Sequence, residues 1–501
     1  MNNISTDIIF EIFKSLSNRE IIFIGQLCKR FQTCVRNVDL HRTFHLHNNP
    51  EHIKLILENY TISKLKIIKM NVIGFEPYLA KCHTLDFSHC TTITNKSVKY
   101  FDKCINLNLA GCKQITDRSI KKLVNCNTLN LCGCNKITDK SVRKLTNCRN
   151  LNLSECYLIT DDGIKNLQCD ILNLSGCKLI TDKSRQVFKN CQELNLSECE
   201  LITDKSSKYL GKCSILNLHR CIRITDKSIR FFTNCHTLDI SWCKLITNDA
   251  MIFLKNCHTL DLSCTSITDE GLKYLGNCHT IDLCNCEITD HGLLYLANCH
   301  KLLLHSCKNI TDKGLEFLRN CSELYFEENH LLTDVGIQNL QNCRTLSIDN
   351  CRLITSKSMK YFKKCDTIYF ECRNRITDRY VEYLENCKDL HLSGITFYND
   401  NLKYLEKCHT LTLFCCKFVP KSSVRYLSNC HTLNIINCSS ISDKHLKYLS
   451  NCRNLNLQRS RKITDEGINY VKKCCGLTLH DCDLISDKVF DFYHNTLNYD
   501  E

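Results

Sequence analysis

One short pattern of apolar and polar residues recurs along most of the chain. From residue 82 to residue 474 a cysteine returns every 21 or 22 residues, and 14 of the 18 steps are 22 residues long. Two apolar residues separated by one polar residue follow each cysteine, such as Leu129 and Leu131. Because side chains alternate along a β-strand, we expect these leucines to point inward and Thr128 and Asn130 to point outward.

The second half of each repeat predicts a short helix. Thr138 and Asp139 are both suited to cap its start, and Val142 and Leu145 lie three residues apart on one face. We expect about two helical turns here. The residue 15 positions after the cysteine is usually Ser or Gly, which predicts that the helix packs closely against its neighbour. The residue before the next cysteine is often Asn, as at Asn147, and we expect it to adopt the left-handed conformation that ends many helices.

Repeats of this size must stack, because a unit of 22 residues cannot bury its own apolar face. We therefore predict an α/β solenoid at residues 82–496, with about 19 repeats, one parallel sheet and an outer layer of helices, followed by a tail at 497–501. Phe44-His45-Leu46 and Leu65-Lys66-Ile67 repeat the strand pattern. We interpret residues 41–81 as a linker that contains two degenerate repeats.

The repeat as a whole resembles the cysteine-containing subclass of leucine-rich repeats. It runs Cys-x-x-Leu-x-Leu-x-x-Cys-x-x-Ile-Thr-Asp, as at residues 126–139, and the resemblance covers roughly residues 82–496. It implies a leucine-rich-repeat horseshoe with a parallel sheet inside and short helices outside. In other subclasses the position of the second cysteine is held by Asn. The repeats of this chain are shorter than is usual for the subclass.

Residues 1–40 follow a different pattern, with apolar residues at helical spacing on both sides of Ser17-Asn18. The segment resembles the F-box, whose pattern runs Leu-Pro-x-Glu, two apolar helices and Val-x-Lys-Arg-Trp. Ile4-Ser5 replaces Leu-Pro, and Phe31 replaces Trp. The resemblance implies an all-α segment that docks a Skp-type adaptor of a cullin-based ubiquitin ligase. The residues implied in docking are Ile4, Ile8, Ile12, Phe13, Leu16, Ile21, Leu27 and Phe31.

Two columns of the repeat hold 35 of the 41 cysteines, so the repeat accounts for most of them. The chain has neither a signal-peptide pattern nor an apolar run long enough for a membrane span. We therefore expect a reducing compartment, either the cytoplasm or the nucleus. In such a compartment buried thiols act as small apolar groups. Cys-His pairs such as Cys235-His236 suggest zinc. However, neighbouring strand residues point to opposite faces and no Cys-x-x-Cys pair is present, so we expect no metal and no cofactor.

Neither enzymatic activity nor nucleic-acid binding is favoured. The sequence contains no phosphate-binding loop, nucleophile elbow or His-Glu-x-x-His motif, and we predict that the chain is not an enzyme. The formal charge is +13, but 53 acidic residues are interleaved with the basic ones and no basic block with aromatic residues appears. Binding of nucleic acid would require one face to concentrate the positive charge.

One outward strand position, four residues after the first cysteine, changes along the chain. It is Asn or Asp from Asp86 to Asp282, which we interpret as a hydrogen-bonded ladder between repeats, and it then becomes Leu, Tyr, Ser, Tyr, His and Thr before Asn434. Exposed aromatic residues are enriched in binding hot spots. We predict a target-binding patch within residues 303–412, formed by Leu303, Tyr325, Glu327, Glu328, Tyr369 and His391.

Together these features predict the substrate-recognition adaptor of a ubiquitin ligase, monomeric apart from that complex, with a protein target on the sheet. The alternative is a stand-alone scaffold whose N-terminal helices cap the first repeat. The Ile-, Asn- and Lys-rich composition and the short repeats are also similar to those of F-box and leucine-rich-repeat proteins of giant DNA viruses, which would place the chain in host cytoplasm.

Overall fold

The computed structural model describes residues 39–40, 44–46, 61–62, 64–67, 76–80, 82–371, 377–472, 474, 476–486 and 489. They fall into two compact units, residues 1–223 (unit 1) and 224–501 (unit 2). The eight predicted adaptor-binding residues, Ile4 to Phe31, and the tail at 497–501 lie outside the described residues.

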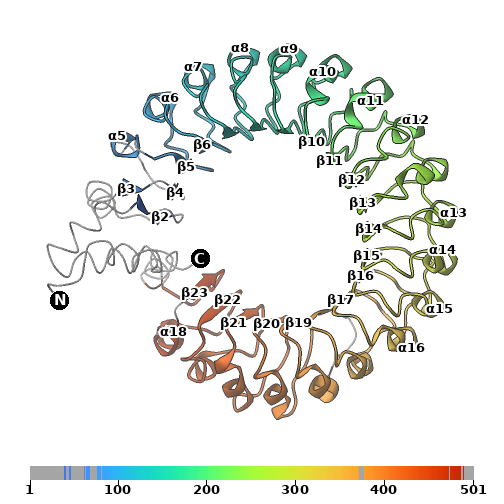
Figure 1. Cartoon of the computed structure of the whole chain (residues 1–501). Coiled ribbons are helices and arrows are strands. Elements are labelled where there is room, and N and C mark those ends of the chain that lie inside the picture. The colour runs from blue at the N-terminus through green and yellow to red at the C-terminus, as the bar shows by residue number, and fades with distance from the viewer. Residues whose placement is uncertain are drawn as a thin grey trace, which may run out of the picture. The chain divides into compact units, whose positions relative to one another are not determined.

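Unit 1 repeats a strand, a turn and a short helix (Figure 1). Its elements are β1 (Asp39–Leu40), β2 (Phe44–Leu46), β3 (Thr61–Ile62), β4 (Lys64–Ile67), α5 (Glu76–Leu79), β5 (Thr84–Asp86), α6 (Asn95–Val98), β6 (Asn106–Asn108), α7 (Asp117–Ile120), β7 (Thr128–Asn130), α8 (Asp139–Val142), β8 (Asn150–Asn152), α9 (Asp161–Ile164), β9 (Ile171–Asn173), η1 (Asp182–Ser184), α10 (Arg185–Phe188), β10 (Glu193–Asn195), η2 (Asp204–Ser206), α11 (Ser207–Leu210) and β11 (Ile215–Asn217).

The strands of unit 1 pair in parallel and in chain order from β4 to β11, and β2 pairs with β4. Equivalent residues of neighbouring repeats face each other, so Leu129 lies between Leu107 and Leu151. A separate pair joins β1 to β3. Every repeat therefore adds one strand to the sheet in the same register.

Unit 2 follows the same plan (Figure 1). Its elements are α12 (Asp226–Ile229), β12 (Thr237–Asp239), η3 (Asn248–Leu254), β13 (Thr259–Asp261), α13 (Asp269–Leu272), β14 (Thr280–Asp282), α14 (Asp290–Tyr295), β15 (Lys301–Leu303), α15 (Asp312–Leu315), β16 (Glu323–Glu327), α16 (Asp334–Ile337), η4 (Gln338–Leu340), β17 (Thr345–Asp349), η5 (Ser356–Tyr361), β18 (Thr367–Glu371), η6 (Asp378–Leu384), β19 (Asp389–Ser393), η7 (Asp400–Leu405), β20 (Thr410–Phe414), η8 (Ser423–Asn429), β21 (Thr432–Ile436), α17 (Asp443–Leu446), β22 (Asn454–Gln458), α18 (Asp465–Val471) and β23 (Gly476–His480).

The strands of unit 2 also pair in parallel from β12 to β23. Strands β12 to β15 contain three residues, whereas β16 to β23 contain five. The sheet is therefore two residues wider in the second part of this unit.

The core of each repeat lies between the sheet and the helices. Leu129 and Leu131 point inward and are at most 1% exposed, and Val142 and Leu145 of the same repeat are fully buried. Burying each such side chain contributes about 1.5–3 kcal/mol to folding. The predicted α/β solenoid of stacked leucine-rich repeats is confirmed.

Two local predictions are wrong. The helices mostly span four residues or form 3₁₀ turns, and not two helical turns, because a repeat of 22 residues leaves little chain for them. Asn147 does not have a positive φ. The left-handed residue of each repeat follows the strand instead, at Gly133 with φ 69° and Glu155 with φ 59°, where the chain must turn sharply away from the sheet.

Candidate functional site

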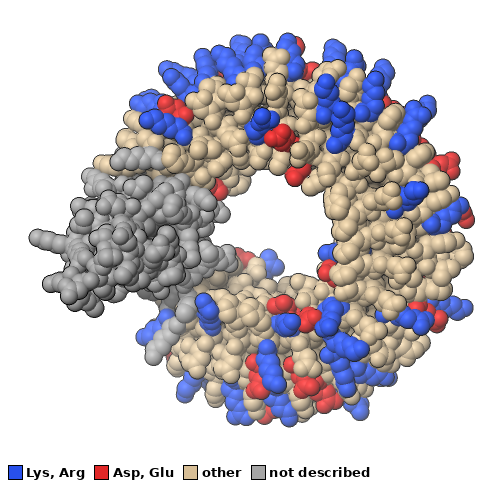
Figure 2. All heavy atoms as spheres, in the orientation of Figure 1, with Lys and Arg blue, Asp and Glu red and all other residues tan. Residues whose placement is uncertain are grey.

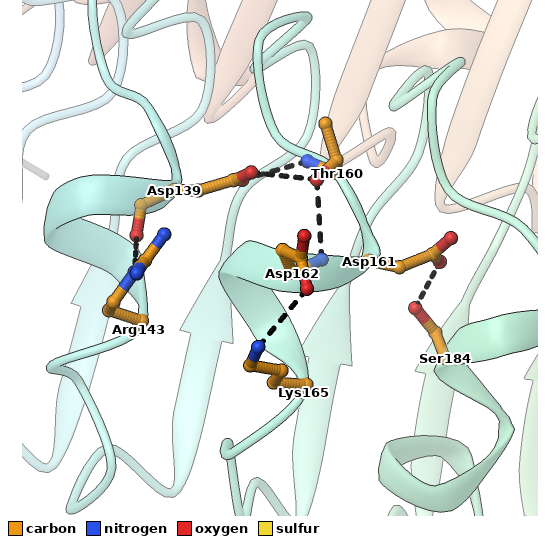
Figure 3. Close-up of polar contacts among 7 residues, drawn as sticks. All are labelled: Asp139, Arg143, Thr160, Asp161, Asp162, Lys165 and Ser184. Atoms are coloured by element: carbon orange, nitrogen blue, oxygen red, sulfur yellow. Dashed lines mark hydrogen bonds and ion pairs between the residues drawn. The ribbon is translucent and has the colours of Figure 1, made fainter.

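A chain of polar contacts links the starts of neighbouring helices (Figure 3). The carboxylate of Asp139 accepts hydrogen bonds from the Thr160 backbone N–H at 2.9 Å and from its hydroxyl at 2.7 Å. Thr160 is the N-cap of α9, and its hydroxyl oxygen accepts from the Asp162 backbone N–H at 3.2 Å. Each aspartate thus fixes the cap of the next helix.

These contacts explain why position 15 is Ser or Gly. Ser184 donates a hydrogen bond from its hydroxyl to Asp161 of the preceding repeat. Gly163 occupies the equivalent position in the repeat before, and a Cβ there would overlap Asp139 Oδ1. The prediction of close helix packing is confirmed, and these Ser, Thr and Asp side chains join neighbouring repeats.

The buried cysteines donate hydrogen bonds between repeats. Cys156 Sγ lies 3.2 Å from the carbonyl oxygen of Leu131 in the preceding repeat. Burial raises the pKa of Cys156 to about 12, so the thiol keeps its proton. Asn329 replaces cysteine in one repeat, and its Nδ2 donates to the carbonyls of Leu304 at 2.9 Å and Cys307 at 3.1 Å. The thiols therefore act as weak donors at a position where a side-chain amide also fits, and are more than apolar filler.

None of the cysteines that the structure describes forms a disulfide. Reduced thiols throughout a folded array fit a reducing compartment. None of the helices in the described part of the chain has the length and apolar character needed to cross a bilayer.

Histidine rings stack at the beginning of strands β12 to β15. Successive ring centroids lie 4.6, 4.6 and 4.5 Å apart along the residues His236, His258, His279 and His300. The preceding Cys235 is 2% exposed and points into the core, so it cannot share a metal with the exposed His236 ring. Within the described ranges, no three His, Cys, Asp or Glu residues are grouped to hold a metal ion. The Cys-His pairs had drawn attention to these histidines, but the stack itself was not predicted.

The uniform Asn and Asp column ends the strands rather than linking the repeats, so the predicted ladder is wrong. Asn130 Oδ1 accepts a hydrogen bond from the backbone N–H of Cys132 in its own repeat at 3.0 Å. Asp261 and Ser263 make the same contact at 2.9 Å. This turn stops the strand after three residues, because the side chain binds an N–H that would otherwise extend the ladder.

The strands become longer one repeat after the outward residue changes. Leu303 is the first residue of this column that is neither Asn nor Asp, yet β15 still ends at Leu303, and the five-residue strands begin with β16. The longer strands continue to β23 although Asn returns at Asn434 and Asn456, and Asn434 donates from Nδ2 to Thr412 Oγ1 at 3.0 Å. The wide part of the sheet therefore coincides only in part with the change of side chain.

Five of the predicted target-binding residues lie on this sheet, on strands β15 to β19, and the sixth, Glu328, lies directly after β16. Leu303 pairs with Tyr325 across β15 and β16, and Tyr369 pairs with His391 across β18 and β19. Tyr369 is 47% exposed, and its ring centroid lies 6.1 Å from that of His391. Burial lowers the pKa of His391, so its ring favours the neutral form.

The two predicted glutamates also lie at this surface. Glu327 Oε2 lies 3.5 Å from His305 Nδ1. Glu328 is exposed and left-handed, with φ 58°, and accepts hydrogen bonds from Ser306 Oγ at 3.3 Å and Asn350 Nδ2 at 3.2 Å. Sequence reasoning missed Asp349 and Glu371, which extend the Glu327 column along β17 and β18.

Positive charge gathers on the helix side of unit 1. Figure 2 shows mostly Lys and Arg over α6 to α11. Exposed examples directly follow the first helical residue, as at Lys96, Arg118 and Lys140. One face thus concentrates positive charge, which the sequence alone did not indicate.

Comparisons with known proteins identify both parts of the chain. A family model described as an F-box domain matches residues 1–43, and one described as a leucine-rich repeat matches residues 258–276. No curated protein matches the chain, and nothing supports the predicted viral resemblance.

Two solved structures are similar to the chain. One is an internalin from Listeria monocytogenes, with 15% identity, a TM-score of 0.30, and coverage of 78% of this chain and 89% of that one. The other is the mouse RP105/MD-1 complex, with 12% identity, a TM-score of 0.48, and coverage of 86% and 93%. With the family matches and the repeats described above, the chain is an F-box domain followed by cysteine-rich leucine-rich repeats.

Proposed function

We propose that the chain is the substrate-recognition subunit of a cullin-type ubiquitin ligase. The observation that carries the proposal is the match of residues 1–43 to the F-box in front of a solenoid of repeats. The F-box implies binding of a Skp-type adaptor, and a wide parallel sheet offers a protein-sized surface. The ubiquitin transfer itself would take place on other subunits, so this chain needs no catalytic residues.

The proposed functions belong to successive segments of the chain. Residues 1–40 dock the adaptor through the apolar set from Ile4 to Phe31, and residues 82–496 present the target, with residues 41–81 between them. The target lies on the sheet near Tyr325 and Tyr369. The chain works as a monomer apart from the ligase, in the cytoplasm or the nucleus.

Binding to a purified Skp-type adaptor tests the proposal. We expect the full chain to retain the adaptor in a pull-down, and the double variant Ile8→Asp, Phe13→Asp to lose it, because two buried charges oppose an apolar interface. The matched control is Tyr325→Ser, Tyr369→Ser, which changes two large side chains far along the sequence and should keep the adaptor. Failure of the unchanged chain to bind the adaptor would overturn the proposal.

The same variants also test the alternative function, in which the chain is a stand-alone scaffold. If the N-terminal helices only cap the first repeat, the double aspartate variant will lower the thermal melting temperature of the repeats. The ligase function instead predicts loss of the adaptor with the melt of the repeats unchanged.

A polyanion partner is a second candidate, favoured by the basic helix side of unit 1. Binding of that kind depends on release of counterions and falls steeply with salt. A labelled DNA duplex provides the test.

A further inference from the structure

The contact that joins the starts of neighbouring helices is interrupted at one junction of unit 2. At a regular junction an Asp accepts a hydrogen bond from the backbone N–H of the next helix cap, as Asp443 does from Thr464 at 2.8 Å. In the repeat that begins at Cys408 this position holds Lys421, whose side chain cannot accept a hydrogen bond. The N–H of Ser442, the helix cap of the following repeat, therefore needs another acceptor.

His445 supplies that acceptor from the same helix. Its Nδ1 accepts a hydrogen bond from the Ser442 backbone N–H at 3.2 Å, and its Nε2 donates to the carbonyl oxygen of Val419 in the preceding repeat at 3.1 Å. His445 is only 3% exposed. Most other repeats hold Ser or Gly here, and at Gly467 a Cβ would overlap the aspartate of the preceding repeat. Lys421 replaces the corresponding aspartate, which leaves room for the imidazole ring.

The two backbone partners fix the protonation of this ring. A backbone N–H can only donate and a carbonyl oxygen can only accept, so Nδ1 carries no proton and Nε2 carries one. The ring is therefore neutral. A proton on Nδ1 would face the Ser442 N–H, break that hydrogen bond and leave a positive charge in a buried position.

The charged groups around His445 also oppose its protonation. Lys421 lies in the preceding repeat and Lys462 in the following one, and both are positive. Asp443, the carboxylate on the same helix, accepts hydrogen bonds from the next helix cap at 2.8 Å and 2.7 Å. Burial lowers the pKa of His445, the two lysines lower it further, and the hydrogen bond to the Val419 carbonyl opposes them only in part.

A weakened junction at this place would release the end of the array. Each repeat of a solenoid contacts only its neighbours, so the loss of one junction uncouples the repeats on its two sides. In the described part of the chain, two complete repeats and part of a third begin at Cys430. An array needs about three repeats to be stable by itself. These last repeats therefore depend on their contact with the rest of unit 2.

We propose that this junction, formed by Val419, Lys421, Ser442 and His445, is a pH-sensitive joint of the solenoid. Protonation of His445 breaks the junction, and the repeats from residue 430 onward open while the earlier repeats of unit 2 stay folded. The closed state binds this proton less readily than the open state. The junction is therefore stable above the ordinary pKa of histidine and weakens as the pH falls below it. This regulation of the repeats is independent of the proposed ligase function.

Hydrogen exchange of the full chain, followed by mass spectrometry, tests the proposal. Protection factors are corrected for the intrinsic effect of pH on exchange. We expect the protection of α17 and α18 to fall severalfold between pH 7.5 and pH 5.5, because protonation favours the open state. The protection of α15 and α16, which lie at regular junctions of the same unit, should change little.

The chain itself provides the design of a matched variant. Lys421→Asp, His445→Ser introduces the residues of a regular junction, at which Asp334 accepts hydrogen bonds from the Thr355 N–H at 2.8 Å and from the Ser358 hydroxyl. We expect α17 and α18 of this variant to be equally protected at both pH values, because such hydrogen bonds keep the carboxylate charged.

A second variant keeps the test valid if the first one does not fold. His445→Gln offers one acceptor and one donor but cannot be protonated, so it should also remove the pH dependence. The same fall of protection in the unchanged chain and in a folded variant would overturn the proposal, because the proton would then bind elsewhere. Constant protection of α17 and α18 in the unchanged chain, or an equal fall in α15 and α16, would also overturn it.

Discussion

Removal of one aspartate from the inter-repeat contacts should destabilise the solenoid measurably. Asp117 accepts three hydrogen bonds from the next repeat, from the Thr138 backbone N–H at 2.8 Å, the Thr138 hydroxyl at 2.6 Å and the Ser141 hydroxyl at 2.6 Å. Partial desolvation opposes ionisation, but the bonds from Ser141 and Thr138 outweigh it and lower the pKa of Asp117. The carboxylate is therefore bound in its charged form.

The size of the effect follows from these contacts. A hydrogen bond to a charged group contributes about 1.5–3 kcal/mol, but the two hydroxyls can turn toward water when their partner is removed. We expect Asp117→Ala to lower the free energy of unfolding by about 2–4 kcal/mol. Asp117→Asn should cost less than about 1 kcal/mol, because a primary amide can accept the N–H and donate to the threonine hydroxyl.

The chain itself contains the matched control for this prediction. Asn95 occupies the equivalent position one repeat earlier, where its Nδ2 donates to Thr116 Oγ1 at 3.0 Å and its Oδ1 accepts from the Thr116 N–H at 3.0 Å. Urea unfolding followed by circular dichroism gives the free energies, and hydrogen exchange locates the change at α7 and α8. If the alanine and asparagine variants are equally stable, the contacts do not stabilise the solenoid.

Three further predictions concern other parts of the molecule. Asn329→Cys should change the free energy of unfolding by less than about 1 kcal/mol. Asn329→Ala, which removes the side-chain hydrogen bonds to the carbonyls of Leu304 and Cys307, should cost about 1–3 kcal/mol in urea unfolding. The lowered pKa of His391 means that the folded chain binds this proton less readily than the unfolded chain, so stability from this residue is present above pH 6.5 and is lost as the pH falls. The melting temperature of His391→Gln should therefore depend less on pH between 7.5 and 5.5 than that of the unchanged chain. Burial raises the pKa of Asp261 to about 6, which has the opposite effect on stability. Both proteins contain Asp261, so its effect cancels in this comparison. If the basic face binds polyanions, fluorescence anisotropy with a labelled DNA duplex should show an affinity that falls steeply as the salt concentration rises. The affinity should also weaken when Lys96, Arg118 and Lys140 are replaced by Gln. An affinity independent of salt would exclude this partner.

The repeating part of the fold could be predicted because each repeat states it again. Leu129, Leu131, Val142 and Leu145 carry the strand and helix periodicities, and all four are buried. Ser or Gly at position 15 indicated close packing, which Gly163 and Asp139 bear out. Such patterns depend only on which side chains face the core, and that information lies in the local sequence.

The features that sequence reasoning missed depend on contacts that no spacing reveals. Asn130 was interpreted as part of a ladder because its hydrogen bond to the backbone N–H of Cys132 is visible only once the turn is folded. The left-handed position was missed because Glu155 is not a residue type that favours positive φ. Gly111 and Gly133 at the equivalent position of earlier repeats were the available signal.

The candidate target surface could be predicted only in part. The change from Asn and Asp to Tyr325 and Tyr369 pointed to strands β16 and β18, but the greater length of these strands, which adds Asp349 and Glu371 to the sheet, could not be foreseen. Strand length depends on the pairing of several neighbouring repeats and not on one residue.

Affinity capture of the full chain from cells, followed by mass spectrometry, tests most directly whether the chain joins a ligase to a target. The unchanged chain should retain a Skp-type adaptor, a cullin and at least one further protein. Ile8→Asp, Phe13→Asp should lose the adaptor and cullin but keep the further protein, and Tyr325→Ser, Tyr369→Ser should do the reverse. Absence of the adaptor and cullin from the unchanged chain, or loss of the same proteins in both variants, would contradict the account.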